Sequence, residues 1–309
     1  KSQAEHLIKK GFKVQVASSD IKNLNFSNKL KYKISFPNKI FDLFNLFNYV
    51  IILIQIKNLV RENPKAIFYL HTPVASHLFR LFTFFKDLKI IYFIHGLRFS
   101  STTNFIKGIF FRIFEKILSF NTNIFITINK EDHNYCKSNF SKRKLYYKVN
   151  GIGLSLSEKH LKKKLTKKNL IKKILVISAY KKDKGYLEKL KLTKILENKK
   201  IKICCFGYGN KKNFELIKIK KKVKNISFNS FDSKLPDKIK NFDILLHLSK
   251  REGLPVSVMQ SLSQGLPVIC YNIRGNNDLI VDKFNGYFVN SYKDVPSKIF
   301  YLNLENDIY

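Results

Sequence analysis

The chain has 309 residues, with 58 Lys and Arg against 22 Asp and Glu, which gives a formal net charge of +36. This length is enough for two domains of ordinary size. Hydrophobic residues make up 45% of the chain, which excludes an intrinsically disordered protein. The cysteines lack the pair spacing of a metal site, so we expect reduced core thiols in a cytosolic protein. They are Cys136, Cys204, Cys205 and Cys270.

Lysine is spread over the whole chain and is densest between Lys162 and Lys224. Such charge attracts nucleic acids, anionic membranes or polyphosphate substrates. Because charged runs usually form solvated faces, we expect the lysines to lie at the surface and expect no nucleic-acid partner.

No stretch predicts a transmembrane helix, because Asp42, Lys57 and other polar residues interrupt the apolar segment 41–60. Residues 1–5 lack the apolar core of a signal peptide, which favours a cytoplasmic location. The first residue is not methionine, and the only methionine is Met259. We therefore expect the sequence to be a piece of a longer chain.

Strand-like and helix-like segments alternate through the first half, which predicts a parallel α/β sheet. Helices are predicted at 4–10, 41–62, 74–85 and 105–120, and strands at 12–17, 33–36, 66–70, 90–94, 123–128 and 145–149. Residues 129–132 predict an N-cap for the helix that follows. His71 and His95 follow two of the strands, where parallel sheets place their ligands. We favour a hydrogen-bonded bystander for His71 and leave both interpretations open for His95.

The helix predicted over 105–120 is amphipathic. Its apolar side carries Ile106, Phe110, Ile113, Phe114 and Ile117, and off that stripe lie Lys107, Arg112 and Lys116. We favour a core helix of the first domain. The alternative is a basic, aromatic surface that rests on a membrane.

Gly151, Gly153 and the lysine-rich stretch up to Lys173 predict a domain boundary, with domains at 1–152 and 153–309. A second α/β pattern follows. Strands are predicted at 174–178, 201–206, 226–228, 243–248, 267–271 and 286–289, and helices at 186–197, near 236–240 and around 295–303.

The segment Glu252-Gly253-Leu254-Pro255 predicts the start of one more short helix, with Pro255 at its first position and Gly265 at its C-cap. A helix that begins there leaves unpaired N–H groups and a positive dipole end, which suits a phosphate. Gly253 would let the phosphate approach the backbone closely.

Residues 249–280, SKREGLPVSVMQSLSQGLPVICYNIRGNNDLI, resemble the donor-binding motif of family 4 glycosyltransferases of the GT-B fold. The stretches HTPVASHLFRL, YFIHGLRF, FEKILSFNTNIFITINKED and NGIGL resemble the N-terminal half of that family's bacterial polysaccharide-assembly branch. The resemblance runs from about residue 5 to residue 289. It implies two Rossmann-like domains with parallel sheets that face across a cleft, the first on the acceptor side and the second holding a nucleotide-sugar.

The resemblance also implies roles for individual residues. His95 would lie next to the transferred sugar, and Glu252 would lie beside the donor sugar. Lys184, followed by Gly185, would contact the diphosphate, and the N–H groups of Gly253 and Leu254 would hold the phosphate. Gly207 and Gln260 would complete the donor side, and His71 and Arg98 are assigned to the acceptor side.

The implied activity is a retaining transfer of a sugar to a lipid-linked glycan, without a metal or a cofactor. UDP is the expected nucleotide, and an N-acetylhexosamine is one candidate sugar. The protein would lie on the inner face of the cytoplasmic membrane and contact its anionic lipids.

Three departures from the family pattern support an alternative. Gln260 replaces the glutamate that binds the ribose, and Ala179 replaces a basic residue near the diphosphate. The first strand of the family and its C-terminal helices have no counterpart, so the chain is expected to be truncated at both ends. The alternative is a catalytically impaired relative that only binds nucleotide.

Overall fold

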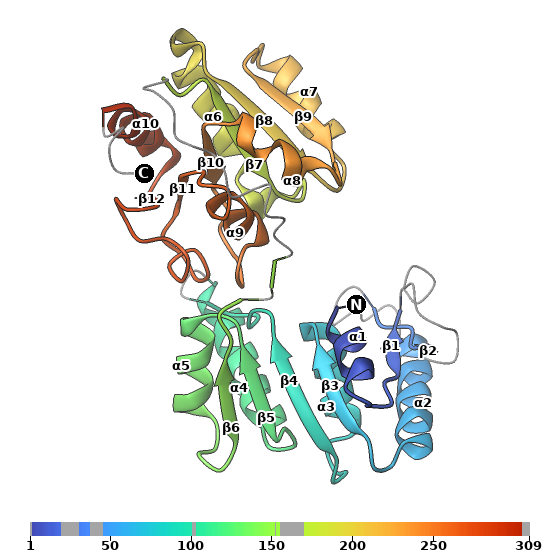
Figure 1. The fold of residues 1–309 in the computed structure, drawn as a ribbon. Helices are drawn as coiled ribbons and strands as arrows, with labels where there is room; N and C mark the ends of the chain where they lie inside the picture. The colour runs from blue at the N-terminus through green and yellow to red at the C-terminus, as the bar shows by residue number, and fades with distance from the viewer. Residues whose placement is uncertain are drawn as a thin grey trace. The chain divides into compact units, whose positions relative to one another are not determined.

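Figure 1 shows the computed structural model of the chain, which describes residues 2–19, 31–37, 46–100, 103–151, 153–154 and 170–304. Contacts divide the chain into two compact units. The first consists of Lys1–Arg98, Ile109–Thr127 and His133–Tyr147, and the second consists of Phe99–Gly108, Ile128–Asp132 and Lys148–Tyr309.

The first unit holds a four-stranded sheet in the order β3-β4-β5-β6, in which β3 pairs in parallel with β4 and β4 with β5. These strands are β3 (Ile67–His71), β4 (Lys89–Ile94), β5 (Ile124–Thr127) and β6 (Leu145–Lys148). A short parallel pair, β1 (Val16–Ser18) and β2 (Lys31–Lys33), forms a second sheet. The parallel sheet is confirmed, whereas the strands predicted at 12–17 and 33–36 were misplaced by several residues.

Five helices are described in the N-terminal half of the chain. They are α1 (Ser2–Lys9), α2 (Leu46–Glu62), α3 (Pro73–Phe82), α4 (Phe105–Leu118) and α5 (Lys130–Asn139). Residues 41–45 of the helix predicted from residue 41 lie outside the described residues. Buried residues of α2, α3, β3 and β4 form the core of this unit, among them Ile52, Ile56, Phe79 and Ile90.

The prediction that the apolar stripe of α4 packs into the core is wrong. Ile106, Phe110, Ile113 and Ile117 are all exposed, and Phe114 is half-buried. The helix instead buries Glu115, which is hydrogen-bonded to two side chains of α3. The hydrophobic periodicity of α4 could not predict this orientation, because the sequence does not show which basic side chains would bind Glu115 in the interior.

The second unit holds a six-stranded, fully parallel sheet in the order β12-β11-β10-β7-β8-β9. The strands are β7 (Lys173–Ile177), β8 (Lys202–Gly207), β9 (Ile226–Ser230), β10 (Ile244–His247), β11 (Val268–Tyr271) and β12 (Gly286–Val289). The helices are α6 (Tyr186–Ile195), α7 (Lys212–Lys220), α8 (Leu235–Lys238), α9 (Val256–Leu262) and α10 (Val295–Leu304).

Helices cover both faces of this sheet, as the side-chain alternation along β7 shows. Ile174 and Val176 pack in a cluster with residues of α6, α7 and α10. Leu175, which points the other way, packs in a cluster with residues of α8 and α9. The unit is therefore doubly wound, as expected for a Rossmann-like domain (Figure 1).

Two details of the second unit differ from the sequence prediction and one agrees with it. Helix α7 was not predicted. Pro255 is the extended N-cap residue of α9 rather than its first residue, and α9 begins at Val256. Gly265 has φ 71°, and the N–H of Leu266 donates to Ser261 O over 2.9 Å, so the predicted C-cap glycine is confirmed.

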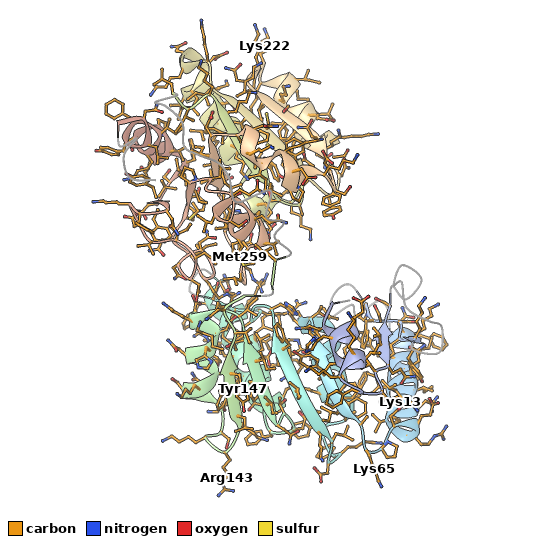
Figure 2. The ribbon with its side chains drawn as sticks, viewed as in Figure 1. Lys13, Lys65, Arg143, Tyr147, Lys222 and Met259 are labelled. Carbon is orange, nitrogen blue, oxygen red and sulfur yellow. The ribbon has the colours of Figure 1, made fainter. Side chains whose placement is uncertain are left out.

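Most of the described lysine and arginine side chains lie on the surface of the two units, as Lys13, Lys65, Arg143 and Lys222 illustrate in Figure 2. Arg80, Lys189 and Arg274 are buried, which differs from the expectation that the basic residues form solvated faces. All four cysteines are free, in agreement with the prediction of reduced thiols. Among the helices that the structure describes, none is both long and apolar enough to span a bilayer.

Candidate functional site

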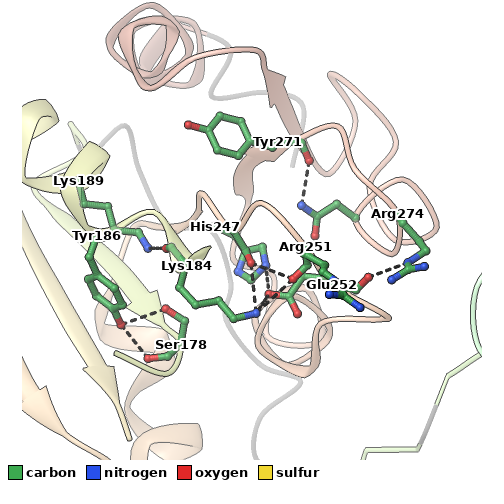
Figure 3. Close-up of polar contacts among 11 residues, drawn as sticks. Ser178, Lys184, Tyr186, Lys189, His247, Arg251, Glu252, Tyr271 and Arg274 are labelled. Atoms are coloured by element: carbon green, nitrogen blue, oxygen red, sulfur yellow. Dashed lines mark hydrogen bonds and ion pairs between the residues drawn. The ribbon is translucent and has the colours of Figure 1, made fainter. Parts of the chain in front are cut away.

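A partly buried ion pair lies at the carboxyl edge of the second sheet. Lys184 ends the 3-10 turn Lys182–Lys184 that follows β7, and Glu252 lies in the loop between β10 and α9. Because β7 and β10 are neighbours in the sheet, their carboxyl ends bring the two residues together. Lys184 Nζ lies 2.6 Å from Glu252 Oε1 and also donates to Ser249 Oγ (3.2 Å) and Arg251 O (3.3 Å) (Figure 3).

Gly185 explains why a glycine follows this lysine. Its φ is 71°, and a Cβ added to it would overlap the carbonyl oxygen of Leu248. Only glycine therefore allows the turn after β7 to pack directly against the end of β10. This close packing places Lys184 beside the segment 249–252.

The carboxylate of Glu252 is held in its ionised form. Burial raises its pKa, but the His247 ring and the Lys184 ammonium outweigh burial and hold the pKa at about 2. The side chains of Lys184 and Glu252 are only 17% and 16% exposed, so solvent screens this pair less than a surface pair.

His247, the last residue of β10, lies beneath the pair, with Nε2 3.3 Å from Glu252 Oε1. It is 4% exposed, and its Nε2 has no hydrogen-bond partner among the described residues. Burial lowers the pKa of His247, and Glu252 opposes that shift. Sequence reasoning missed this residue, although a histidine inside the apolar strand 243–248 was an available signal.

Lys189 of α6 is a second missed residue. It is 1% exposed, its Nζ donates to Lys184 O over 2.5 Å, and it lies 4.4 Å from the centre of the Tyr186 ring. Burial lowers its pKa to about 8. Lys189 thus holds the backbone of Lys184 in place through this hydrogen bond (Figure 3).

Side chains from elsewhere in the second unit hold the carbonyl groups of Glu252 and Gly253. Arg274 Nε donates to Glu252 O over 2.9 Å, and its Nη1 donates to Asp132 Oδ1 over 2.8 Å. Asn129 Nδ2 donates to Gly253 O over 3.1 Å. The N–H groups of Gly253 and Leu254 donate to no other described residue. Two backbone donors therefore remain available next to a lysine ammonium, which is an arrangement suited to an anion.

The remaining donor-side predictions fall on the same sheet edge or on α9. Gly207 ends β8, and a Cβ there would overlap Ser178 O, so tight strand packing accounts for this glycine. Gln260 lies half-buried on α9, and its side chain makes no hydrogen bond to another described residue. Its predicted role at a ribose stays a prediction.

In the first unit, the register of β3 and β4 places His71 opposite Phe93, two residues before His95. His71 Nδ1 and His95 Nε2 lie 3.0 Å apart, so one ring donates a hydrogen bond to the other. Burial and then the neighbouring His95 lower the pKa of His71 to about 4, and burial lowers the pKa of His95. The pair is therefore uncharged at neutral pH.

Arg98, also assigned to the acceptor side, lies four residues beyond the end of β4, with its guanidinium 5.6 Å from the centre of the Phe111 ring. His71, His95 and Arg98 belong to the first unit, and Lys184 and Glu252 belong to the second. Within the described ranges, no three His, Cys, Asp or Glu side chains form a group that could hold a metal ion.

Residues 157–299 match the model of a protein family described as "Glycosyl transferases group 1". The match covers a little under half of the chain, so this part of the chain is similar to that family. The matched region contains Lys184, His247, Glu252 and Gln260, whereas Asn129 and Asp132, which help to hold the segment 252–253, lie outside it.

Two curated relatives are also similar to this chain. The chain is 25% identical to EpsD of Bacillus subtilis (strain 168), described as a glycosyltransferase, over 90% of this chain and 76% of EpsD. It is 35% identical over 65 residues to the Escherichia coli UDP-Gal:alpha-D-GlcNAc-diphosphoundecaprenol alpha-1,3-galactosyltransferase, which is 21% of this chain and 16% of that protein.

Solved structures support the fold. Anabaena Alr3699/HepE in complex with UDP matches with a TM-score of 0.64 at 13% identity, over 82% of this chain and 73% of that one. This chain spans only about half the length of two other solved chains that it matches. The predicted α/β fold with two parallel sheets and the resemblance to GT-B glycosyltransferases are both confirmed.

Proposed function

We propose that this chain is a retaining glycosyltransferase that moves a sugar from a UDP-sugar to a lipid-linked glycan. The observation that supports this best is the cluster at the edge of the second sheet. There Lys184 pairs with a carboxylate, beside the N–H groups of Gly253 and Leu254, which donate to no residue that the structure describes. The structurally similar protein HepE was solved in complex with UDP. The name of the E. coli galactosyltransferase that resembles part of this chain gives UDP-Gal as its donor.

The proposed chemistry follows from where charge develops during transfer. As the sugar leaves, the nucleoside diphosphate gains negative charge on its terminal phosphate. Fixed N–H donors and an ammonium stabilise that charge more than they stabilise the bound donor, and this lowers the barrier. Lys184 has three N–H donors, which bind Glu252 Oε1, Ser249 Oγ and Arg251 O. Lys184 would exchange one of the two longer bonds, to Ser249 or Arg251, for a phosphate oxygen and still bind Glu252.

We assign Glu252 to the donor sugar, where its carboxylate accepts hydrogen bonds from hydroxyl groups. Its pKa of about 2 keeps it ionised throughout the physiological range. We assign His95 to the transferred sugar and His71 to orienting the His95 ring through their 3.0 Å contact. An uncharged imidazole offers one donor and one acceptor, which suits a sugar hydroxyl group.

The acceptor and the pathway are proposed from the relatives. The similar galactosyltransferase takes a GlcNAc-diphosphoundecaprenol, and EpsD is described as a glycosyltransferase. We therefore propose a polyprenyl-diphosphate sugar as the acceptor and cell-surface polysaccharide synthesis as the process. Galactose and an N-acetylhexosamine are the first donor sugars to examine.

The test is transfer of radiolabel from a panel of UDP-sugars to GlcNAc-diphosphoundecaprenol. Label should enter the lipid phase, and both Lys184→Ala and His95→Ala should lower the initial rate about 100-fold or more, as removal of a charge-stabilising group does. Lys182→Ala, an exposed lysine of the same turn, is the matched control and should retain the wild-type rate. Full activity of both site variants would overturn the assignment.

A second candidate is a relative that binds nucleotide but does not transfer sugar. Gln260 favours it, because an amide forms a weaker hydrogen bond to a ribose hydroxyl than a carboxylate does. Calorimetric titration separates the two: UDP binding without transfer to any acceptor of the panel would favour this candidate.

A further inference from the structure

Helix α6 carries a lysine at a position that faces the core. The buried residues of this helix are Tyr186, Lys189, Leu190, Leu192 and Thr193. Tyr186, Leu190 and Leu192 belong to the apolar cluster on one face of the second sheet, and Lys189, which is 1% exposed, lies among them on α6. Lysine is almost never fully buried unless it is paired, because taking an ammonium group out of water is costly. The burial of Lys189 therefore needs an explanation.

No carboxylate that the structure describes forms an ion pair with Lys189. Glu188, its neighbour on α6, binds Lys250 over 2.8 Å, and Glu252 binds Lys184. Neutral groups hold the ammonium instead. Its Nζ donates to Lys184 O over 2.5 Å and lies 4.4 Å from the centre of the Tyr186 ring, within the range of a cation–π contact. The positive charge of Lys189 is thus not cancelled by a direct partner.

The two neutral partners connect Lys189 to the donor cluster (Figure 3). Lys184, whose carbonyl accepts the hydrogen bond, is the residue whose ammonium binds Glu252. Tyr186 is itself held in place, because its hydroxyl donates to Ser178 O over 2.7 Å and accepts from Ser178 Oγ over 3.0 Å. Lys189 therefore fixes the backbone of the lysine that we assign to the diphosphate.

We propose that Lys189 is a positioning residue of the donor site, whose protonated side chain holds Lys184 in place and strengthens the binding of a nucleoside diphosphate without touching it. This inference rests on the proposed function, because it takes the diphosphate to bind at Lys184. A buried positive charge attracts a nearby anion more strongly than an exposed lysine does, since water and salt screen it less. The attraction adds to the effect of the hydrogen bond to Lys184 O.

The protonation of Lys189 makes this contribution depend on pH. Burial lowers the pKa of Lys189 to about 8, with Lys184 acting in the same direction and Glu188 and Glu252 opposing it. Burial raises the pKa of the nearby Cys205 thiol to about 12, so that group stays neutral. The titratable groups that face Lys189 are Glu188 of α6, Cys205 of β8, His247 of β10, Lys184 and Glu252. A bound diphosphate favours the protonated lysine, so binding should be strongest below about pH 8 and weaken as the pH rises through that value.

The test is calorimetric titration of UDP at pH 7, 8 and 9 into the wild type, Lys189→Met and Lys194→Met. The charge of UDP changes little over this range, since the second pKa of a phosphate is about 6. Lys189→Met keeps an unbranched side chain in the core and removes a buried charge, so the variant should fold at least as stably as the wild type, which thermal unfolding checks. Lys194→Met changes an exposed lysine of the same helix and is the matched control.

We expect Lys189→Met to bind UDP about fivefold more weakly than the wild type at pH 7, an effect of the size that one poorly screened charge has on a nearby anion. Its affinity should stay constant up to pH 9, whereas that of the wild type should fall about threefold. Lys194→Met should follow the wild type at each pH. A purely structural role of Lys189 would lower the affinity of Lys189→Met equally at each pH.

Two outcomes would overturn the proposal and leave the proposed function in place. They are equal UDP affinity of the wild type and Lys189→Met at pH 7, and the same pH dependence in both proteins. No UDP binding by the wild type at any of the three pH values would overturn the proposed function and the role of Lys189 together.

Discussion

Replacing Glu115 by glutamine tests whether the buried network determines how α4 packs. The substitution keeps the side-chain shape but removes the anion that neutralises Arg80, which is fully buried. Burial raises the pKa of Glu115, but Arg80 and His77 outweigh it and hold the pKa at about 2, against an ordinary 4.5. A difference of about 2.5 units corresponds to about 3 kcal/mol, close to the ~3–5 kcal/mol expected for breaking a buried ion pair.

The assay is urea unfolding followed by far-ultraviolet circular dichroism, with hydrogen–deuterium exchange of α3 and α4 to locate the effect. Glu115→Gln should lower the free energy of unfolding by about 3 kcal/mol at pH 7 and speed exchange in both helices. The control Lys238→Gln breaks an exposed pair with Asp232, which solvent screens, and should lower the free energy of unfolding far less. A loss below about 1 kcal/mol for Glu115→Gln would refute the reasoning.

The same network predicts a pH dependence with a definite sign. Because the pKa of Glu115 is lower in the folded state than in the unfolded chain, its contribution is fully present above about pH 4.5 and is lost as the pH falls toward about 2. The difference in the free energy of unfolding between the wild type and Glu115→Gln should therefore shrink as the pH falls from about 4.5 toward about 2. A constant difference between the two proteins from pH 6 to pH 3 would contradict the assignment of the shift to this residue.

Three further predictions concern the second unit. Gln260→Glu should tighten UDP binding about fivefold or more in calorimetry, since a carboxylate accepts a stronger hydrogen bond from a ribose hydroxyl; unchanged affinity would remove Gln260 from the donor site. Gly185→Ala should destabilise the second unit by at least about 1 kcal/mol in urea unfolding, because a Cβ there meets Leu248 O at a positive φ; wild-type stability would contradict that packing. Treatment with EDTA should leave sugar transfer unchanged if the reaction needs no metal, and loss of activity that Mg²⁺ restores would contradict metal independence.

Most of the sheet architecture was predictable, because short apolar runs between helical segments are typical of buried parallel strands. The end of α9 was predictable as well, since Gly265 adopts the left-handed conformation that a helix terminus favours. Helix α7 was missed because Leu216 and Ile219 are exposed while Phe214 is buried, so its apolar residues do not mark one face.

The candidate site was also predicted only in part. Lys184 and Glu252 were expected at the donor site from the resemblance to family 4 glycosyltransferases, and the structure brings them together in one ion pair. His247, Lys189 and Arg274 were not predicted. His247 and Lys189 lie only five residues from their partners Glu252 and Lys184, but the sequence does not say that their buried polar ends turn toward the pair.

The prediction that the apolar side of α4 faces the core was wrong for a similar reason. The hydrogen bonds from His77 and Arg80 to Glu115 orient the helix, and the sequence of α4 alone does not show them.

Calorimetric titration of UDP into the wild type, Lys184→Ala and Lys182→Ala tests most directly whether the Lys184–Glu252 cluster binds the diphosphate. Lys184 would contribute a hydrogen bond between charged groups, so Lys184→Ala should weaken binding about tenfold or more, while the exposed Lys182→Ala keeps the wild-type affinity. Equal UDP affinity for all three proteins, or no UDP binding by the wild type, would contradict the assignment of this cluster to a nucleotide-sugar.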